Sequence, residues 1–203
     1  MNKKLISYKL LITLLILFFN LQSSTKADNI NDFDIDGISI GESFLKYVSK
    51  NLIEHKYKSF YPKSKEYFLV EFDQNDLNFL KNYTHIGIHF KENDNKYKVY
   101  SIKGMMDYDN DLNGCLNQKK IIVKSINETL ENSEEEKYEN NFDNLYGKSK
   151  AYISDFKVDN GYIRVWCTDW DKSADNAQNW VDTINVDLSN QTFLDWLNTK
   201  AYD

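Results

Sequence analysis

Proline, glycine and cysteine are all scarce in this chain of 203 residues. The single proline, Pro62, and the few glycines argue against a flexible linker or a disordered tail, because such segments are rich in these residues. Only Cys115 and Cys167 supply thiols, and no CxxC or HExxH motif occurs. Aromatic residues, in contrast, make up 15% of the chain, enough for a real hydrophobic core. The sequence predicts a globular protein without a strong catalytic or metal-binding signature.

Long apolar runs are also missing, with one exception near the N-terminus. Residues 10–21 are almost wholly apolar, follow three lysines, and lead through a short polar stretch to Ala27. This order is typical of a signal peptide cleaved after Ala27, and the run is shorter than the roughly 20 residues of a spanning helix. An uncleaved anchor is the alternative. We therefore expect a signal peptide at 1–27 and an exported domain at 28–203, periplasmic or secreted, with no stable membrane insertion after cleavage.

Positive charge is limited, and Arg164 is the only arginine. Removal of residues 1–27 takes away four lysines and no acidic residue, which leaves 21 basic against 31 acidic residues and a net charge near −10. Such a charge repels nucleic acid and anionic membranes, so we exclude both classes of partner.

Apolar spacing and turn signals predict an α+β fold with a mainly antiparallel sheet, in the approximate order αβββαβββα. The first helix is expected to follow a capping box at Ser39 and Glu42 and to end near His55. Residues 131–143 are acidic and are expected to form an exposed loop. Further helices are predicted at 114–130 and 191–200, and strands at 67–72, 84–90, 97–102, 149–158, 162–169 and 180–188. One domain is expected, with two loosely similar αβββ halves as the finer hypothesis.

The two cysteines are predicted to form a disulfide. Asn160-Gly161 is a hairpin signal, and along the strand that follows, Cys167 points to the same side as Ile163 and Val165. Cys115 lies at the start of an amphipathic helix, beside its apolar side. A bridge between them would tie the helix to the sheet and, across 52 residues, would stabilise the fold by about 4 kcal/mol.

The opposite side of this strand is the best candidate for a ligand or partner face. Alternation places Tyr162, Arg164, Trp166 and Thr168 in a row, which Trp170 extends past the strand end. Aligned aromatic rings can stack on sugar rings or hold an apolar partner. The alternative is that a second layer of the protein covers these side chains.

Two patterns resemble metal sites incompletely. Asp32, Asp34, Asp36 and Gly37 match the start of a calcium loop, but the twelfth position is Ser43 rather than a bidentate glutamate. An acidic surface loop explains them better.

His85 and His89 have the spacing of zinc ligands on a helix, yet they lie in a strand pattern, where four residues span about 13 Å. We expect solvent-facing histidines, no metal, no cofactor and no catalytic residue.

Three segments carry a family resemblance. Residues 34–43 (DIDGISIGES), the helix around Cys115 and residues 165–170 (VWCTDW) are similar to small exported proteins of marine alphaproteobacteria with AT-rich genomes, an uncharacterised group. The resemblance implies a periplasmic location and assigns no activity, cofactor or site residue.

These observations favour a non-catalytic binding protein or accessory of the cell envelope, whose ligand would be a glycan, a peptide or an envelope protein. A hydrolase that uses a pair of carboxylates is one alternative, which the many Asp and Glu residues permit without any supporting spacing. A purely structural envelope component is the other.

Overall fold

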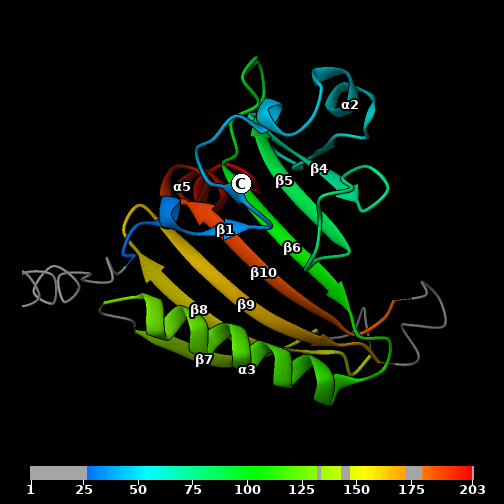
Figure 1. Cartoon of the computed structure of the whole chain (residues 1–203), viewed down its shortest axis with the longest axis vertical. Coiled ribbons are helices and arrows are strands. Elements are labelled where there is room, and N and C mark those ends of the chain that lie inside the picture. The colour runs from blue at the N-terminus through cyan, green and yellow to red at the C-terminus, as the bar shows by residue number, and fades with distance from the viewer. Residues whose placement is uncertain (1–26, 132–133, 143–146, 172–179, 203) are drawn as a thin grey trace, which may run out of the picture.

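A computed structural model describes residues 27–131, 134–142, 147–171 and 180–202, so the predicted signal peptide lies outside it except for Ala27. Eight antiparallel strands form one sheet in the order β3-β4-β5-β6-β10-β9-β8-β7 (Figure 1). The strands are β3 (Ser59–Phe60), β4 (Tyr67–Asp73), β5 (His85–Lys91), β6 (Ser101–Asp107), β7 (Glu135–Asn141), β8 (Lys150–Val158), β9 (Gly161–Asp169) and β10 (Thr183–Asn190). A separate hairpin joins β1 (Asp34–Ile35) and β2 (Ile38–Ser39).

Three α-helices occur in the described ranges: α2 (Lys50–His55), α3 (Leu112–Thr129) and α5 (Gln191–Thr199). Figure 1 shows α3 across the front of the sheet and α5 behind it. These two helices define the α3 face and the α5 face. The predicted α+β class with a mainly antiparallel sheet is confirmed. None of the helices in these ranges has an apolar stretch long enough to cross a membrane.

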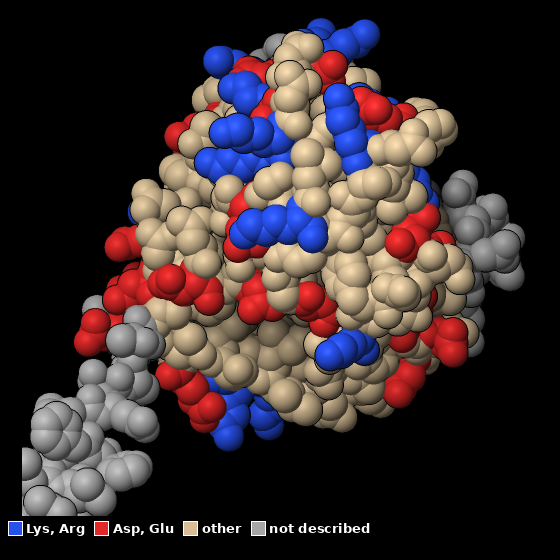
Figure 2. Space-filling model, turned by 45° about the horizontal axis from the view of Figure 1, so that its top comes forward, with Lys and Arg blue, Asp and Glu red and all other residues tan. Residues whose placement is uncertain are grey.

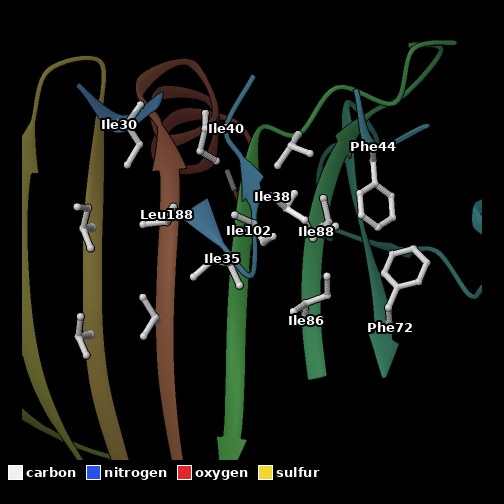
Figure 3. Close-up of a cluster of buried hydrophobic side chains, with 14 of the residues drawn as sticks. Ile30, Ile35, Ile38, Ile40, Phe44, Phe72, Ile86, Ile88, Ile102 and Leu188 are labelled. Atoms are coloured by element: carbon white, nitrogen blue, oxygen red, sulfur yellow. The ribbon is translucent and has the colours of Figure 1, made fainter. Parts of the chain in front are cut away.

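The main hydrophobic core lies on the α3 face. Helix α3 covers the β9 side of this face, and the β1–β2 hairpin covers the middle of the sheet. Ile35 and Ile38 of the hairpin lie over Ile102 and Leu188, as Figure 3 shows. All four side chains are buried, and each fully buried side chain of this size stabilises the fold by roughly 1.5–3 kcal/mol. The hairpin, α3 and the segment around Phe44, which packs on Phe72 and Phe90, together close this face.

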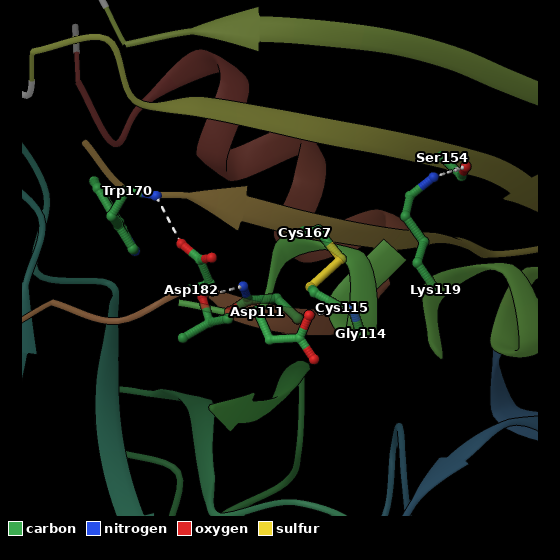
Figure 4. The surroundings of a disulfide bond; sticks show 10 residues. Asp111, Gly114, Cys115, Lys119, Ser154, Cys167, Trp170 and Asp182 are labelled. Carbon is green, nitrogen blue, oxygen red and sulfur yellow. Dashed lines mark hydrogen bonds between the residues drawn. A yellow bond between two sulfur atoms is a disulfide. The ribbon is translucent and has the colours of Figure 1, made fainter. Parts of the chain in front are cut away.

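The predicted disulfide is present and joins α3 to β9. Cys115 in the first turn of α3 bonds to Cys167, and their Cα atoms are 6.0 Å apart (Figure 4). Both residues are fully buried. The helix begins beside this bond, because the carboxylate of its N-cap Asp111 accepts a hydrogen bond from the backbone N–H of Gly114 at 2.9 Å. Cap and disulfide therefore fix the same end of the helix.

The first predicted helix is wrong at its start. Ser39 lies in β2, and Gly41 follows with a φ of +86°, in the left-handed region that interrupts a helix. Gly41 donates its N–H to the carbonyl of Val99, which fixes a turn at this position, and only the short 3-10 helix η2 (Phe44–Lys46) follows before Ser49. The α-helix begins only after Ser49, whose side chain caps the N–H of Leu52. Its end at His55 agrees with the prediction.

The predicted element order αβββαβββα is also wrong, and the acidic segment 131–143 is the clearest reason. Residues 135–141 form the edge strand β7 in unbroken register with β8, from Glu135↔Phe156 to Asn141↔Lys150. Charged side chains are common on edge strands, because they discourage pairing with other chains. The strand predicted at 97–102 starts later, at Ser101, because residues 97–99 bond to residues 42–44 instead.

The hairpin signal at residues 160–161 marks a real turn, displaced by one residue. Val158 pairs with Gly161, so Asp159 and Asn160 form the turn, and Asn160 has a φ of +59°. Gly161 serves a different purpose, since a Cβ at this position would lie 2.5 Å from the carbonyl oxygen of Ser189. The glycine allows β10 to approach β9 closely.

Candidate functional site

Charged side chains cross the α5 face in a single row. Cross-strand pairing places Lys103 of β6 beside Asp187 of β10, Asp187 beside Arg164 of β9, and Arg164 beside Asp155 of β8. Directly opposite residues on neighbouring strands are about 5 Å apart at Cβ, so neighbouring members of this row are in electrostatic contact. The row alternates positive and negative charge.

A pocket of about 470 Å³ opens where this row meets α5, and we call it the α5 pocket. Its volume falls within the range of known small-molecule sites, about 300–1,000 Å³. The sheet supplies the floor and α5 supplies one wall. Its lining residues are Tyr61, His89, Lys157, Gly161, Tyr162, Arg164, Asp187, Ser189, Gln191, Phe193, Leu194, Leu197 and Asn198.

Asp187 is the acidic group of the α5 pocket. Its Oδ1 accepts hydrogen bonds from the hydroxyls of Ser189 at 2.7 Å and Ser101 at 3.4 Å, which fix the carboxyl group. Burial raises the pKa of Asp187, and the hydrogen bonds and the charges of Lys103 and Arg164 oppose that rise. Oδ2 accepts no hydrogen bond from the described residues, so it is available to a ligand.

Arg164 is held rigidly beside Asp187. Its Nε and Nη2 donate to the two carboxylate oxygens of Asp155 at 2.8 and 2.9 Å, and Nη2 also donates to the hydroxyl of Tyr138 at 2.9 Å. Burial raises the pKa of Asp155, but the bonds from Arg164 and the two tyrosines Tyr162 and Tyr138 outweigh it and keep the pKa below its usual value. Tyr162 also interacts with the guanidinium group, and Nη1 is the part of Arg164 that the bonds to Asp155 and Tyr138 do not use.

His89 is a half-buried, neutral imidazole in the same pocket. Burial and, to a smaller extent, the charge of Lys103 lower its pKa to about 3. Its Nε2 lies 2.9 Å from the hydroxyl of Tyr61, and its ring packs on Phe193 of α5 at 4.5 Å between ring centroids. Nδ1 is buried and has no hydrogen-bond partner within the described part of the chain.

The helical wall of the pocket combines apolar and amide side chains. Asn190 caps α5 by accepting a hydrogen bond from the N–H of Phe193 at 2.8 Å, so the helix starts directly at the end of β10. Phe193 and Leu197 then present an apolar surface, and the carboxamides of Gln191 and Asn198 add polar groups to the rim. The pocket therefore offers a charged floor and an amphipathic wall.

The structure brings together part of the candidate face predicted from sequence. Tyr162 and Arg164 line the α5 pocket, with the guanidinium carbon of Arg164 5.7 Å from the centre of the Tyr162 ring. Trp166 shares the face and is half-buried, outside the pocket lining. Trp170 lies past the strand end and packs on Phe142 and Trp180. Thr168 is buried.

Sequence reasoning missed most of the pocket lining, including Asp187 and His89. Asp187 was one acidic residue among many, and its alternation with Val186 and Leu188 was the available signal. His89 was expected to face solvent, and this expectation is wrong, because α5 packs over it. His85, at the other end of the strand, is exposed as expected.

A second pocket, of about 590 Å³, lies between the β1–β2 hairpin and α3, and the hollow below a band of acidic side chains is visible in Figure 2. The carboxylates of Asp34 and Asp36 in the calcium-like motif accept hydrogen bonds from backbone N–H groups here. Asp34 accepts the N–H of Gly37 at 2.6 Å, and Asp36 accepts the N–H groups of Lys81 and Asn82 at 2.9 and 3.0 Å. Within the described residues no three metal-ligating side chains converge.

Comparisons with protein-family models, with curated proteins and with solved structures found no match for this chain.

Proposed function

We propose that this protein is an exported, non-catalytic binding protein that holds a neutral saccharide in the α5 pocket. One observation carries the proposal. Across neighbouring strands, Asp187 keeps a carboxylate oxygen and Arg164 keeps an Nη1 group that the bonds to Ser189, Asp155 and Tyr138 do not use, while both side chains are fixed by other protein groups.

A sugar matches this arrangement chemically. Each hydroxyl both donates and accepts hydrogen bonds, so neighbouring hydroxyls can bond to Asp187 and Arg164 together. The C–H face of a sugar ring is apolar and can pack on Tyr162, Phe193 or Leu197. A neutral sugar also avoids the repulsion that the acidic protein exerts on polyanions.

Binding fits the pocket better than hydrolysis. Glycoside hydrolases commonly use two carboxyl groups that flank the bond to be broken. Asp187 is the only carboxyl group among the described residues that line the α5 pocket, and Asp155 is occupied by Arg164. The disulfide supports export, since such bonds persist in oxidising compartments.

A binding experiment on the mature domain tests the proposal. We expect saccharides of glucose or N-acetylglucosamine to raise the melting temperature, while peptides and divalent ions do not. At a hundredfold excess over Kd the gain is about 2.7 kcal/mol, or roughly 5–10 °C for a domain of this size. Isothermal titration calorimetry then gives the affinity.

Two matched variants locate the site. Asp187→Asn keeps the shape but removes the charge, and we expect it to weaken saccharide binding by about 1.5–3 kcal/mol, the range for hydrogen bonds to charged groups. Asp107→Asn makes the same change on the α5 face outside the pocket and should leave affinity unchanged. Equal affinities for both variants would place the site elsewhere. No response to sugars, peptides or ions would favour the structural envelope component.

A further inference from the structure

A smaller pocket of about 250 Å³ lies next to the α5 pocket, and we call it the edge pocket. It contains no charged side chain among its described lining residues, and its most exposed aromatic ring is that of Tyr202, which is 62% exposed, whereas the Phe60 ring packs on Phe68. Its lining residues are Ser59, Phe60, Tyr61, Pro62, Leu69 and Tyr202. An uncharged aromatic surface of this kind suits the C–H face of a sugar ring.

Tyr61 connects the two pockets, since it lines both of them. Its ring packs edge-on against Tyr202 at 5.4 Å and against Trp196 at 5.0 Å between centroids. Its hydroxyl reaches His89 in the α5 pocket. Burial raises the pKa of Tyr61, and the nearby Tyr202 and Asp187, one from each pocket, raise it further. One side chain therefore forms the boundary between both cavities.

Strand register aligns the pockets along one line. Leu69 in the edge pocket pairs with His89, and the same row continues through Ser101 and Ser189 to Tyr162. The row crosses from β4 to β9, which spans four strand spacings or about 19 Å. This length exceeds that of a single sugar ring.

We propose that the α5 pocket and the edge pocket form one extended site, which binds a saccharide chain that runs across the strands. This inference rests on the proposed function and adds the length and direction of the ligand. The α5 pocket holds the sugar that bonds to Asp187 and Arg164. The edge pocket holds a further unit of the same chain, stacked on Tyr202.

A ladder of N-acetylglucosamine oligomers, with a parallel glucose ladder, tests the length of the site by isothermal titration calorimetry. We expect affinity to rise with chain length until both pockets are filled and then to level off. Tyr202→Ala should weaken binding of the longest oligomers about tenfold and leave the shortest bound ligand unaffected, because only the long chains reach Tyr202.

Tyr57→Ala is the matched control, since Tyr57 is 85% exposed and lines neither pocket. It should bind every oligomer like the wild type, and melting curves should show that both variants are folded. Equal affinity for short and long oligomers would overturn the extended site while the proposed function stands. Failure of both ladders to bind would overturn the proposed function and the extended site together.

Discussion

The two faces of the eight-stranded sheet differ in the interactions that their side chains make. On the α3 face, apolar residues from β4, β5, β6, β9 and β10 pack against α3 and the β1–β2 hairpin, and a disulfide joins helix to strand. On the α5 face, charged and polar residues of β6, β8, β9 and β10 lie in register, and Arg164 forms an ion pair with Asp155. Because successive side chains of a strand point to opposite faces of the sheet, the same strands form an apolar core on the α3 face and a charged surface on the α5 face.

The difference indicates how a site can be built without weakening the fold. Apolar burial on the α3 face supplies the stability, because it scales with the area removed from water. The α5 face can then hold groups that oppose folding, such as Asp187 with its raised pKa and the unpaired Nδ1 of His89. Such groups are common where a ligand will later satisfy them.

Removal of the disulfide should have the largest effect on stability. Replacing Cys115 and Cys167 by alanine opens the loop that the disulfide closes between two residues 52 positions apart. The unfolded chain then gains conformational entropy, and the free energy of unfolding should fall by about 4 kcal/mol. Urea unfolding followed by circular dichroism measures the loss. Wild-type protein treated with a reductant should show a similar loss, and a change below about 1 kcal/mol in both would show that packing alone fixes α3.

A cavity on the α3 face should cost somewhat less. Phe156→Ala removes a fully buried ring and should destabilise the fold by roughly 3 kcal/mol. Trp166→Ala on the α5 face removes a larger but half-buried ring and should cost less than that. Urea unfolding of both variants compares the faces directly. A greater loss for Trp166→Ala would show that the stability of the sheet depends equally on its polar side.

The disulfide and the long helices could be predicted because their signals are local. The helical spacing after Cys115 and the strand alternation around Cys167 each need only a few neighbouring residues. The segment from Ser39 to Ser49 was mispredicted because its conformation depends on distant partners, the carbonyl of Val99 above all. A capping-box pattern cannot reveal a bond that spans 58 residues of chain.

The candidate site was predicted in part for the same reason. Tyr162 and Arg164 belong to one strand, so alternation alone places them on one face. Asp187 and His89 belong to two other strands, and only the sheet order brings Asp187 beside Arg164 and places His89 in the same pocket under α5. A polar residue in an alternating strand looks solvent-facing until the strand neighbours and the covering helix are known.

The ion pair of the α5 face should contribute less than the apolar core. Asp155→Asn breaks the two-bond pair with Arg164 and should lower the free energy of unfolding by about 2 kcal/mol at neutral pH. The value is below that of a fully buried pair, because the Arg164 side chain is 42% exposed and can be hydrated. Because the pKa of Asp155 is lowered in the fold, this stability is present above pH 4 and is lost as the pH falls below it. Urea unfolding of both proteins across pH 3–8 tests whether their difference shrinks in acid; a constant difference would exclude the ion pair.

Asp187→Asn should have the smallest effect and the opposite sign. Burial raises the pKa of Asp187 in the fold above the unfolded-state value of about 4. The wild type therefore loses stability as the pH rises from about 4 toward the folded-state pKa, because the carboxyl group then ionises more readily in the unfolded chain. Asparagine keeps an oxygen for the hydroxyls of Ser189 and Ser101 and carries no charge, so the variant should be more stable by about 1 kcal/mol at neutral pH. The gain should vanish below pH 4, where the wild-type carboxyl is protonated in both states, and Asp107→Asn should show neither change. If Asp187→Asn is less stable than the wild type at pH 7, the carboxylate of Asp187 stabilises the fold through its neighbours in the charge row. The side chains of the α5 face would then stabilise the fold as those of the α3 face do, and Asp187 would not be a group that awaits a ligand.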